Sequence, residues 1–163
     1  MNKKVNGLNL IIAIIIPLAV GVLSSFITKD AMMSFNAMKK PPLAPPGILF
    51  PIVWSILYVM MGISSCLIYE SDAKNDITLK TERSKWLLIY AIQLVFNFFW
   101  SIIFFKLSLY FLAFIWLLIL WVLVLLLIVK SMKLNKVAGY LLAPYLFWLT
   151  FAGYLNLGVV ILN

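Results

Sequence analysis

Five stretches of this chain are long enough and apolar enough to cross a lipid bilayer. A helix of about 20 apolar residues spans a hydrocarbon core of ~30 Å, and none of the five carries a charged residue in its interior. Because backbone amides and carbonyls inside lipid must pair within their own segment, each stretch is predicted to be a helix. The expected bounds are approximately 8–28, 48–69, 86–105, 107–129 and 137–162.

Composition supports one membrane-embedded bundle. Hydrophobic residues make up 65% of the chain, whereas soluble domains contain about 45–50%. The longest polar connections, 30–46 and 70–85, are too short to hold a folded domain, and we expect the second to be a solvated loop. The first apolar run is longer than that of a signal peptide and is expected to remain as a helix. We therefore predict an all-α, five-helix transmembrane bundle that forms a single domain over residues 1–163.

The basic residues divide unequally between the two sides of such a bundle. The N-terminus, second loop and fourth loop share one side and hold nine of the 13 Lys and Arg residues, against four on the other. Positively charged short loops stay in the cytoplasm, so the N-terminus is expected inside and the C-terminus outside, in a bacterial cell membrane. The charges are scattered among loops rather than gathered on one face, which argues against nucleic-acid binding.

Residue types that usually carry membrane chemistry are missing from the spans. The chain contains no histidine, and the span interiors contain no Asp, Glu, Lys or Arg. Ionisable residues inside a membrane normally mark proton relays and ion pathways, so coupled transport, a metal site and hydrolytic catalytic sets are not expected. Haem ligation by histidine is excluded, while a Cys, Met or Tyr ligand stays open without support from any motif. No cofactor is required.

Polar, small and aromatic residues instead recur at four-residue spacing on three predicted helices. These stripes are Trp54, Tyr58 and Gly62; Gln93, Asn97 and Ser101 beside Trp100; and Trp148, Ala152 and Asn156. Residues four apart share a helix face, so the stripes could enclose an apolar pocket for flat aromatic ligands. The alternative is that small and polar residues hold helices together while aromatic residues fill gaps. Tyr69, Trp86 and Tyr90 are expected to be interfacial anchors.

A proline-rich segment separates the first two helices. Four prolines occur within Pro41–Pro46, and proline fixes its own φ while pushing the preceding residue toward extended backbone. We call residues 39–47 the strap. It is predicted to be a stiff, shaped lid, although a simple linker that delays the second helix would also fit.

Three motifs in order resemble the translocator protein family, also called tryptophan-rich sensory proteins or peripheral benzodiazepine receptors. They are Lys-Pro-x-x-x-Pro-Pro and Phe-x-x-x-Trp-x-x-x-Tyr at 40–58, Gln-x-x-x-Asn-x-x-Trp-Ser-x-x-Phe-Phe at 93–105, and Pro-Tyr-x-x-Trp-x-x-Phe-Ala-x-x-Leu-Asn at 144–156. The resemblance implies a five-helix bundle, commonly a homodimer, whose pocket is closed by the first loop. Members bind porphyrins, sterols and benzodiazepine-type ligands, and some bacterial members break down protoporphyrin in light.

Carried over by motif, the resemblance implies a set of ligand-binding residues. These are Phe35, Pro45, Phe50, Trp54, Tyr58, Asn97, Trp100, Trp148 and Ala152. Trp54 and Trp148 match the tryptophans linked to the light reaction. Ser34 and Phe35 stand where members usually have Trp-Tyr, and Ile48 where a tryptophan is frequent, so ligand preference is expected to differ.

The expected function is therefore an integral membrane receptor or sensor for a tetrapyrrole such as porphyrin or haem. A light-dependent porphyrin-degrading enzyme and a porphyrin transporter are the alternatives, and a bundle that only scaffolds partners is a third. The expected partners are the lipid bilayer, a porphyrin-type small molecule and a second copy of the chain.

Overall fold

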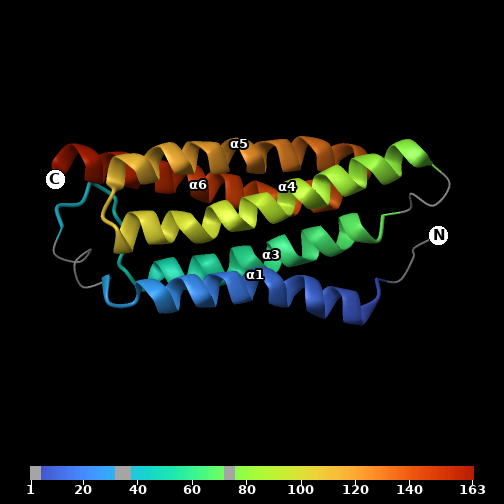
Figure 1. The fold of residues 1–163 in the computed structure, drawn as a ribbon, viewed down its shortest axis with the longest axis horizontal. Coiled ribbons are helices and arrows are strands. Elements are labelled where there is room, and N and C mark those ends of the chain that lie inside the picture. Colours follow the sequence, from blue (N-terminus) through green and yellow to red (C-terminus); the bar gives the residue numbers. More distant parts are fainter. Residues whose placement is uncertain (1–4, 32–37, 72–75) are drawn as a thin grey trace.

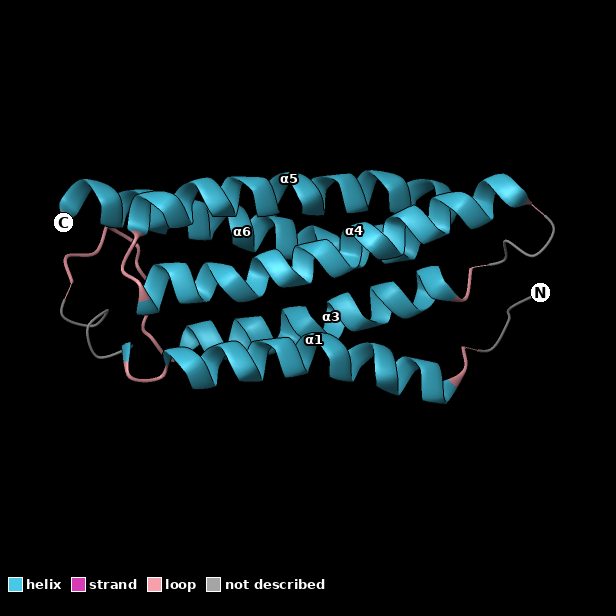
Figure 2. Cartoon of the chain, in the orientation of Figure 1, coloured by secondary structure: helices cyan, strands magenta, loops and turns pink. Residues whose placement is uncertain are grey.

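The computed structural model describes residues 5–31, 38–71 and 76–163. Five long helices lie side by side along one axis, with α1 beginning at one end of the bundle and α6 finishing at the other (Figure 1). Loops and helices account for the described residues, with no strand among them (Figure 2). The elements are α1 (Gly7–Thr28), α3 (Leu49–Tyr69), α4 (Ile77–Ser101), η1 (Ile102–Lys106), α5 (Tyr110–Leu134) and α6 (Lys136–Leu162).

All five helices, with η1 continuing α4, are long and apolar enough to cross a membrane. The protein is an integral, multi-pass membrane protein, and the predicted all-α class is confirmed. The predicted bounds of the first, second and fifth helices hold to within one residue. The direction in which the bundle crosses the membrane stays a prediction from its lysine distribution.

The third helix begins at Ile77, nine residues before the predicted start, so most of the expected loop is helical. The Asp76 carboxylate caps this end by accepting hydrogen bonds from the amides of Thr78 and Leu79. Glu82 then pairs with Lys85 at 3.1 Å and with Lys130 of α5 at 2.8 Å. Hydropathy identified only the part of α4 that can enter lipid, whereas capping and ion pairs extend the helix into water.

The fourth helix also differs, since it runs over Tyr110–Leu134 rather than 107–129. The part of α5 beyond the predicted end at 129 packs against the first turns of α4. The indole of Trp86 donates to the Ser131 hydroxyl at 2.8 Å and to the Leu127 carbonyl at 3.0 Å. Trp86 is 0% exposed and Tyr90 is also buried, so both are core residues. The expectation that they are interfacial anchors was wrong, because helix-to-helix contact continues to this end of the bundle.

Helix α1 lies at the edge of the bundle and packs mainly on α3. Gly62 permits this contact, since a Cβ built there would lie 2.5 Å from the Ile14 Cα and 2.7 Å from the Ala13 carbonyl oxygen. Where α1 begins and α3 ends, the Glu70 carboxylate joins the two helices by accepting hydrogen bonds from the Asn6 amide and the Asn9 side chain. The α1–α3 pair thus approaches α4 and α6 as one unit.

Candidate functional site

Aromatic side chains from α3, α4 and α6 gather in the half of the bundle that the strap covers. Trp54 stacks on Tyr58 with ring centroids 5.4 Å apart and meets the edge of Tyr145 at 5.9 Å. Trp100 stacks on Phe104 at 5.4 Å. The two stacked pairs give the interior flat apolar walls, of the kind against which an aromatic ring system packs.

The larger cavity in this half lies between α1, α3 and α4, and we call it the α1-side cavity. Its volume is about 590 Å³. It is lined by Leu18, Gly21, Val22, Ser24, Ser25, Phe26, Thr28, Lys29, Phe50, Pro51, Trp54, Ser55, Tyr58, Trp100, Ser101 and Phe105. Two of the α1 lining residues, Val22 and Phe26, are also exposed on the outside of the bundle.

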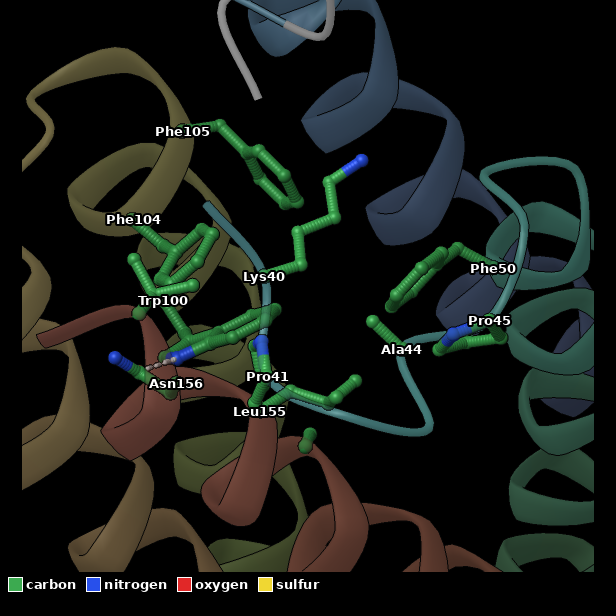
Figure 3. Close-up of a pocket in the computed structure, with 12 residues that line it drawn as sticks. Lys40, Pro41, Ala44, Pro45, Phe50, Trp100, Phe104, Phe105, Leu155 and Asn156 are labelled. Atoms are coloured by element: carbon green, nitrogen blue, oxygen red, sulfur yellow. Dashed lines mark hydrogen bonds between the residues drawn. The ribbon is translucent and has the colours of Figure 1, made fainter. Parts of the chain in front are cut away.

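A second, much smaller cavity is lined by residues of the strap, and we call it the strap cavity. Its volume is only about 20 Å³, enough for a single water molecule. It is lined by Lys40, Pro41, Ala44, Pro45, Phe50, Trp100, Phe104, Phe105, Ala152, Leu155, Asn156 and Val159 (Figure 3). The predicted site residues Pro45 and Ala152 therefore both line this small cavity.

Among the described residues, Trp148 lines neither the α1-side cavity nor the strap cavity. It borders an apolar groove of about 490 Å³ between α3 and α6, with Val53, Met60 and Pro144 among its neighbours. Of the three predicted tryptophans, Trp54 and Trp100 line the α1-side cavity and Trp148 lines this groove. Trp148 meets Phe50 edge-on at 5.9 Å, and its indole nitrogen is buried without a hydrogen-bond partner among the described residues.

Asn97 takes part in a buried hydrogen-bond network and is in the lining of neither the α1-side cavity nor the strap cavity. Its side-chain oxygen accepts from the Tyr58 hydroxyl at 2.7 Å, and its amide donates to the Tyr145 hydroxyl at 2.9 Å. Tyr145 in turn donates to Gln93 at 3.1 Å. This network joins α3, α4 and α6 and occupies both polar atoms of Asn97, which are then satisfied without a ligand.

A second polar link fixes Trp100 in its place. The indole donates to the Asn156 oxygen at 3.4 Å, and the Asn156 amide donates to the Tyr110 carbonyl at 2.8 Å. Trp100 is only 6% exposed. The ring that borders both cavities is therefore held by α6 and by the start of α5.

Predicted residues thus fall into distinct places. Phe50 and Trp100 line both cavities, Trp54 and Tyr58 line the α1-side cavity, and Phe35 lies outside the described residues. The family motifs did not predict that residues of α1 line the cavity, although the sequence of α1 contains a pattern that could have indicated it. Gly21, Ser24, Ser25 and Thr28 are small or polar residues at helical spacing within an otherwise apolar span.

Three hydrogen bonds and one packing contact hold the strap on the end of α6. The Tyr154 hydroxyl donates to the Pro42 carbonyl at 2.7 Å, and Asn163 both accepts from the Lys39 amide and donates to the Lys39 carbonyl. The ring of Pro41 lies against Gly158, where a Cβ would come within 2.5 Å of it. The strap, which was predicted to be a lid, is therefore packed against α6, and this packing requires a glycine at position 158.

A tight turn shapes the middle of the strap. The Ala44 amide donates to the Pro41 carbonyl at 3.3 Å, and Leu43 has a φ of 68°. This is the pattern of a type II turn with proline at its second position. Glycine is usual where Leu43 stands, and a leucine at positive φ costs about 1–2 kcal/mol, so the docked strap includes a strained residue that is 83% exposed.

We expect Gly158→Ala to loosen the strap. The added methyl group has to displace Pro41, whereas in Gly153→Ala, on the same helix, it meets only Leu117 at an ordinary 3.7 Å. Trypsin in detergent micelles should cleave after Lys39 several-fold faster in Gly158→Ala, while the Lys40–Pro41 bond resists the protease. Equal cleavage of Gly158→Ala, Gly153→Ala and the unaltered protein would show that Pro41 docking does not hold the strap.

Comparison with known proteins agrees with this arrangement. The sequence profile of the TspO/MBR family matches residues 13–162. The chain is 35% identical to the tryptophan-rich protein TspO of Chlorobaculum tepidum, over 100% of this chain and 99% of that protein. It is 34% identical to the tryptophan-rich protein TspO of Archaeoglobus fulgidus, over 97% and 99%.

A eukaryotic relative extends the similarity. The translocator protein of Bos taurus is 29% identical over 75% of this chain and 70% of that protein. The family resemblance noted in the sequence is thereby confirmed, on a five-helix membrane bundle with a proline strap across one end. This protein belongs to the TspO/MBR family.

Proposed function

We propose that this protein is a membrane receptor for flat, largely apolar ring systems of the tetrapyrrole class. The observation that carries the proposal is the α1-side cavity, about 590 Å³ in volume and walled by Trp54, Tyr58 and Trp100. Ligand sites are typically clefts of ~300–1,000 Å³ lined by apolar and aromatic side chains with a few polar groups. Stacking on such walls contributes ~0.5–1.5 kcal/mol per ring pair beyond the area buried.

Charge at the rims supports a ligand with acidic substituents. Lys29 lines the α1-side cavity and Lys40 lines the strap cavity, and neither lining set includes an Asp or Glu. Both lysines lie at the strap end, where a ligand inserted with its apolar edge first would keep its carboxylates. A carboxylate paired with an ammonium group forms a charge-assisted hydrogen bond, which is stronger than a neutral one.

The arrangement favours binding over active transport. The buried network of Tyr58, Asn97 and Tyr145 joins α3, α4 and α6 next to the α1-side cavity, which Tyr58 also lines. The span interiors carry no charged residue that could couple movement of a ligand to an ion gradient. A receptor only has to bind its ligand, so it needs no charged residue that couples ligand movement to an ion gradient.

A titration in the dark tests the proposal. Protoporphyrin IX is added to the purified protein in nanodiscs, and binding is followed by the shift of the porphyrin's own Soret band. Trp54→Leu is expected to weaken binding about 3–10-fold, because it removes one stacking wall, with tenfold corresponding to about 1.4 kcal/mol. Trp121→Leu is the control, since Trp121 lies on α5 and donates to Thr150 rather than lining either cavity.

Two results would contradict the proposal. One is the absence of saturable binding to the unaltered protein, and the other is identical affinity in Trp54→Leu and Trp121→Leu. Repeating the titration under illumination separates binding from breakdown. A Soret band that decays only with protein present, and more slowly in Trp54→Leu, would favour the degrading enzyme instead.

A further inference from the structure

Most serine and threonine hydroxyls in the described spans donate a hydrogen bond to a backbone carbonyl. This is the usual arrangement in a membrane helix, where lipid offers a hydroxyl no other partner. Apart from the polar first turns of α4, the donors are Thr28, Ser55, Ser64, Ser65, Ser131 and Thr150, at distances of 2.7–2.9 Å. These hydroxyls are satisfied within the protein.

Three serines of the spans depart from this pattern, namely Ser24 and Ser25 of α1 and Ser101 of α4. Their hydroxyls have no hydrogen-bond partner among the residues that the structure describes. All three line the α1-side cavity. Ser25 lies at its exposed edge and Ser101 is half-buried, whereas Ser24 is only 4% exposed. The unused hydroxyl donors of the spans are therefore gathered in one cavity.

The charge of the lining indicates what these donors can bind. A buried hydroxyl without a partner loses its hydrogen bonds to water and gains none in return. Lys29 adds an ammonium group to the same lining, which contains no Asp or Glu. A carboxylate accepts hydrogen bonds and donates none, and its bonds to charged donors are among the strongest in proteins. A carboxylate is thus the group that complements this set of donors.

The aromatic side chains of the cavity come from other elements than most of its polar ones. Trp54 and Tyr58 belong to α3 and Trp100 to α4, whereas Ser24 and Lys29 belong to α1. A flat ring with an acid on its edge can therefore stack on α3 and α4 while the acid meets α1.

Gly21 keeps this part of α1 close to the aromatic side chains. A Cβ built at Gly21 would overlap the Tyr58 ring, so α1 and this ring are in direct contact. The ring is also stacked on Trp54 at 5.4 Å, and its hydroxyl is bonded to Asn97 at 2.7 Å. Ser24 follows Gly21 by three residues and shares its helix face, which places the hydroxyl beside the stacked pair.

We propose that Ser24 and Ser101 form a subsite that binds a carboxylate of the ligand, with Lys29 pairing with the same group. The inference rests on the proposed function and deepens it, because it names the residues that recognise the acid and sets the orientation of the ring. The acid lies against α1, and the ring packs on Trp54 and Trp100. A ring of equal size without an acid leaves both hydroxyls unpaired and binds less tightly.

The test compares two acids with two acid-free counterparts, in nanodiscs of zwitterionic lipid. Protoporphyrin IX is paired with etioporphyrin, a porphyrin that carries only alkyl groups, and 2-naphthoate is paired with 2-ethylnaphthalene. Affinities are measured by calorimetric titration, and empty nanodiscs give the partition of each ligand into lipid. The unaltered protein should bind each acid about tenfold more tightly than its counterpart.

Removing the hydroxyls should weaken the acids alone. Ser24→Ala is expected to lower the affinity for both acids about fivefold, and Ser24→Ala combined with Ser101→Ala about 20-fold, because hydrogen bonds to a charged group are the stronger kind. Affinity for the acid-free ligands should stay within about twofold, which also shows that the variants fold. Ser65→Ala is the matched control, since its hydroxyl donates to the Gly62 carbonyl and it lines neither cavity.

The outcomes separate this inference from the proposed function. If the unaltered protein binds protoporphyrin IX but the serine variants match Ser65→Ala, the subsite is wrong and the receptor proposal stands. Equal weakening of acids and acid-free ligands would also overturn the subsite, because the serines would then only shape the cavity. If the protein binds 2-naphthoate but neither porphyrin, and Ser24→Ala weakens 2-naphthoate alone, the subsite is supported and the tetrapyrrole proposal fails.

Oleate tests whether a fatty acid is the source of the carboxylate. It has the acid but no ring, so it should not displace 2-naphthoate at equal concentration. Displacement by oleate would overturn the assignment to a ring-bearing acid. Failure of both acids to bind would contradict the subsite and the receptor together.

Discussion

Replacing Gly62 with alanine is expected to destabilise the bundle by about 3 kcal/mol, the upper range for overpacking a tight contact. The new Cβ would lie 2.5 Å from the Ile14 Cα and 2.7 Å from the Ala13 carbonyl oxygen. Both are backbone atoms, so no side-chain rotation relieves the contact and α1 has to move away from α3. The measurement is reversible unfolding by SDS in mixed micelles, followed by helical circular dichroism.

Gly153→Ala provides the matched control for Gly62→Ala. It is the same substitution inside a helix, with only the Leu117 side chain near the new methyl group, at 3.7 Å. Alanine favours helix over glycine by about 1 kcal/mol, so this variant should be as stable as the unaltered protein or slightly more so. Should both variants unfold alike, the close approach of α1 at Gly62 would not be what joins the two helices.

The second large effect is expected at Asn97. Asn97→Leu keeps a similar volume but removes the acceptor of the Tyr58 hydroxyl and the amide that donates to the Tyr145 hydroxyl, which still donates to Gln93. An unsatisfied buried polar group costs about 1–3 kcal/mol, and the loss should lie near 2 kcal/mol because interhelical hydrogen bonds in membranes average only about 0.6 kcal/mol each. The same unfolding assay measures it.

Tyr58→Phe tests whether the loss of stability comes from the hydrogen-bond network or from a change in side-chain packing. It removes one hydroxyl and leaves the Asn97 amide bonded to Tyr145, so its cost should be roughly half that of Asn97→Leu. A larger effect on protoporphyrin affinity than on unfolding in Asn97→Leu would instead place Asn97 in direct contact with ligand. Either result decides whether this asparagine acts through the fold or through the site.

Much of the fold was predictable because the bilayer restricts it. Apolar length and the absence of charge located five helices, and the bounds were accurate where a helix ends close to the lipid, as at Thr28 and Tyr69. They failed for α4, whose first turns are polar and are stabilised by the Asp76 cap and the Glu82 ion pairs. Hydropathy carries no information about a helix once it has left the membrane.

The candidate site was predictable by residue type but not by grouping. Four-residue spacing put Trp54 with Tyr58, whose rings stack at 5.4 Å, since spacing defines a helix face. It could not say which faces meet. Trp148 shares its spacing pattern with Trp54, yet it lines a groove between α3 and α6 and not the α1-side cavity that Trp54 lines.

The sequence alone determined that this protein is a five-helix membrane bundle with no charged group in its span interiors, because an unpaired backbone inside lipid leaves few other solutions. Only the tertiary structure decided that Asn97 bonds to Tyr58 and Tyr145 on two other helices, and that α1 and the strap pack closely against Gly62 and Gly158. Those features depend on distances between helices, which residue spacing within one helix does not encode.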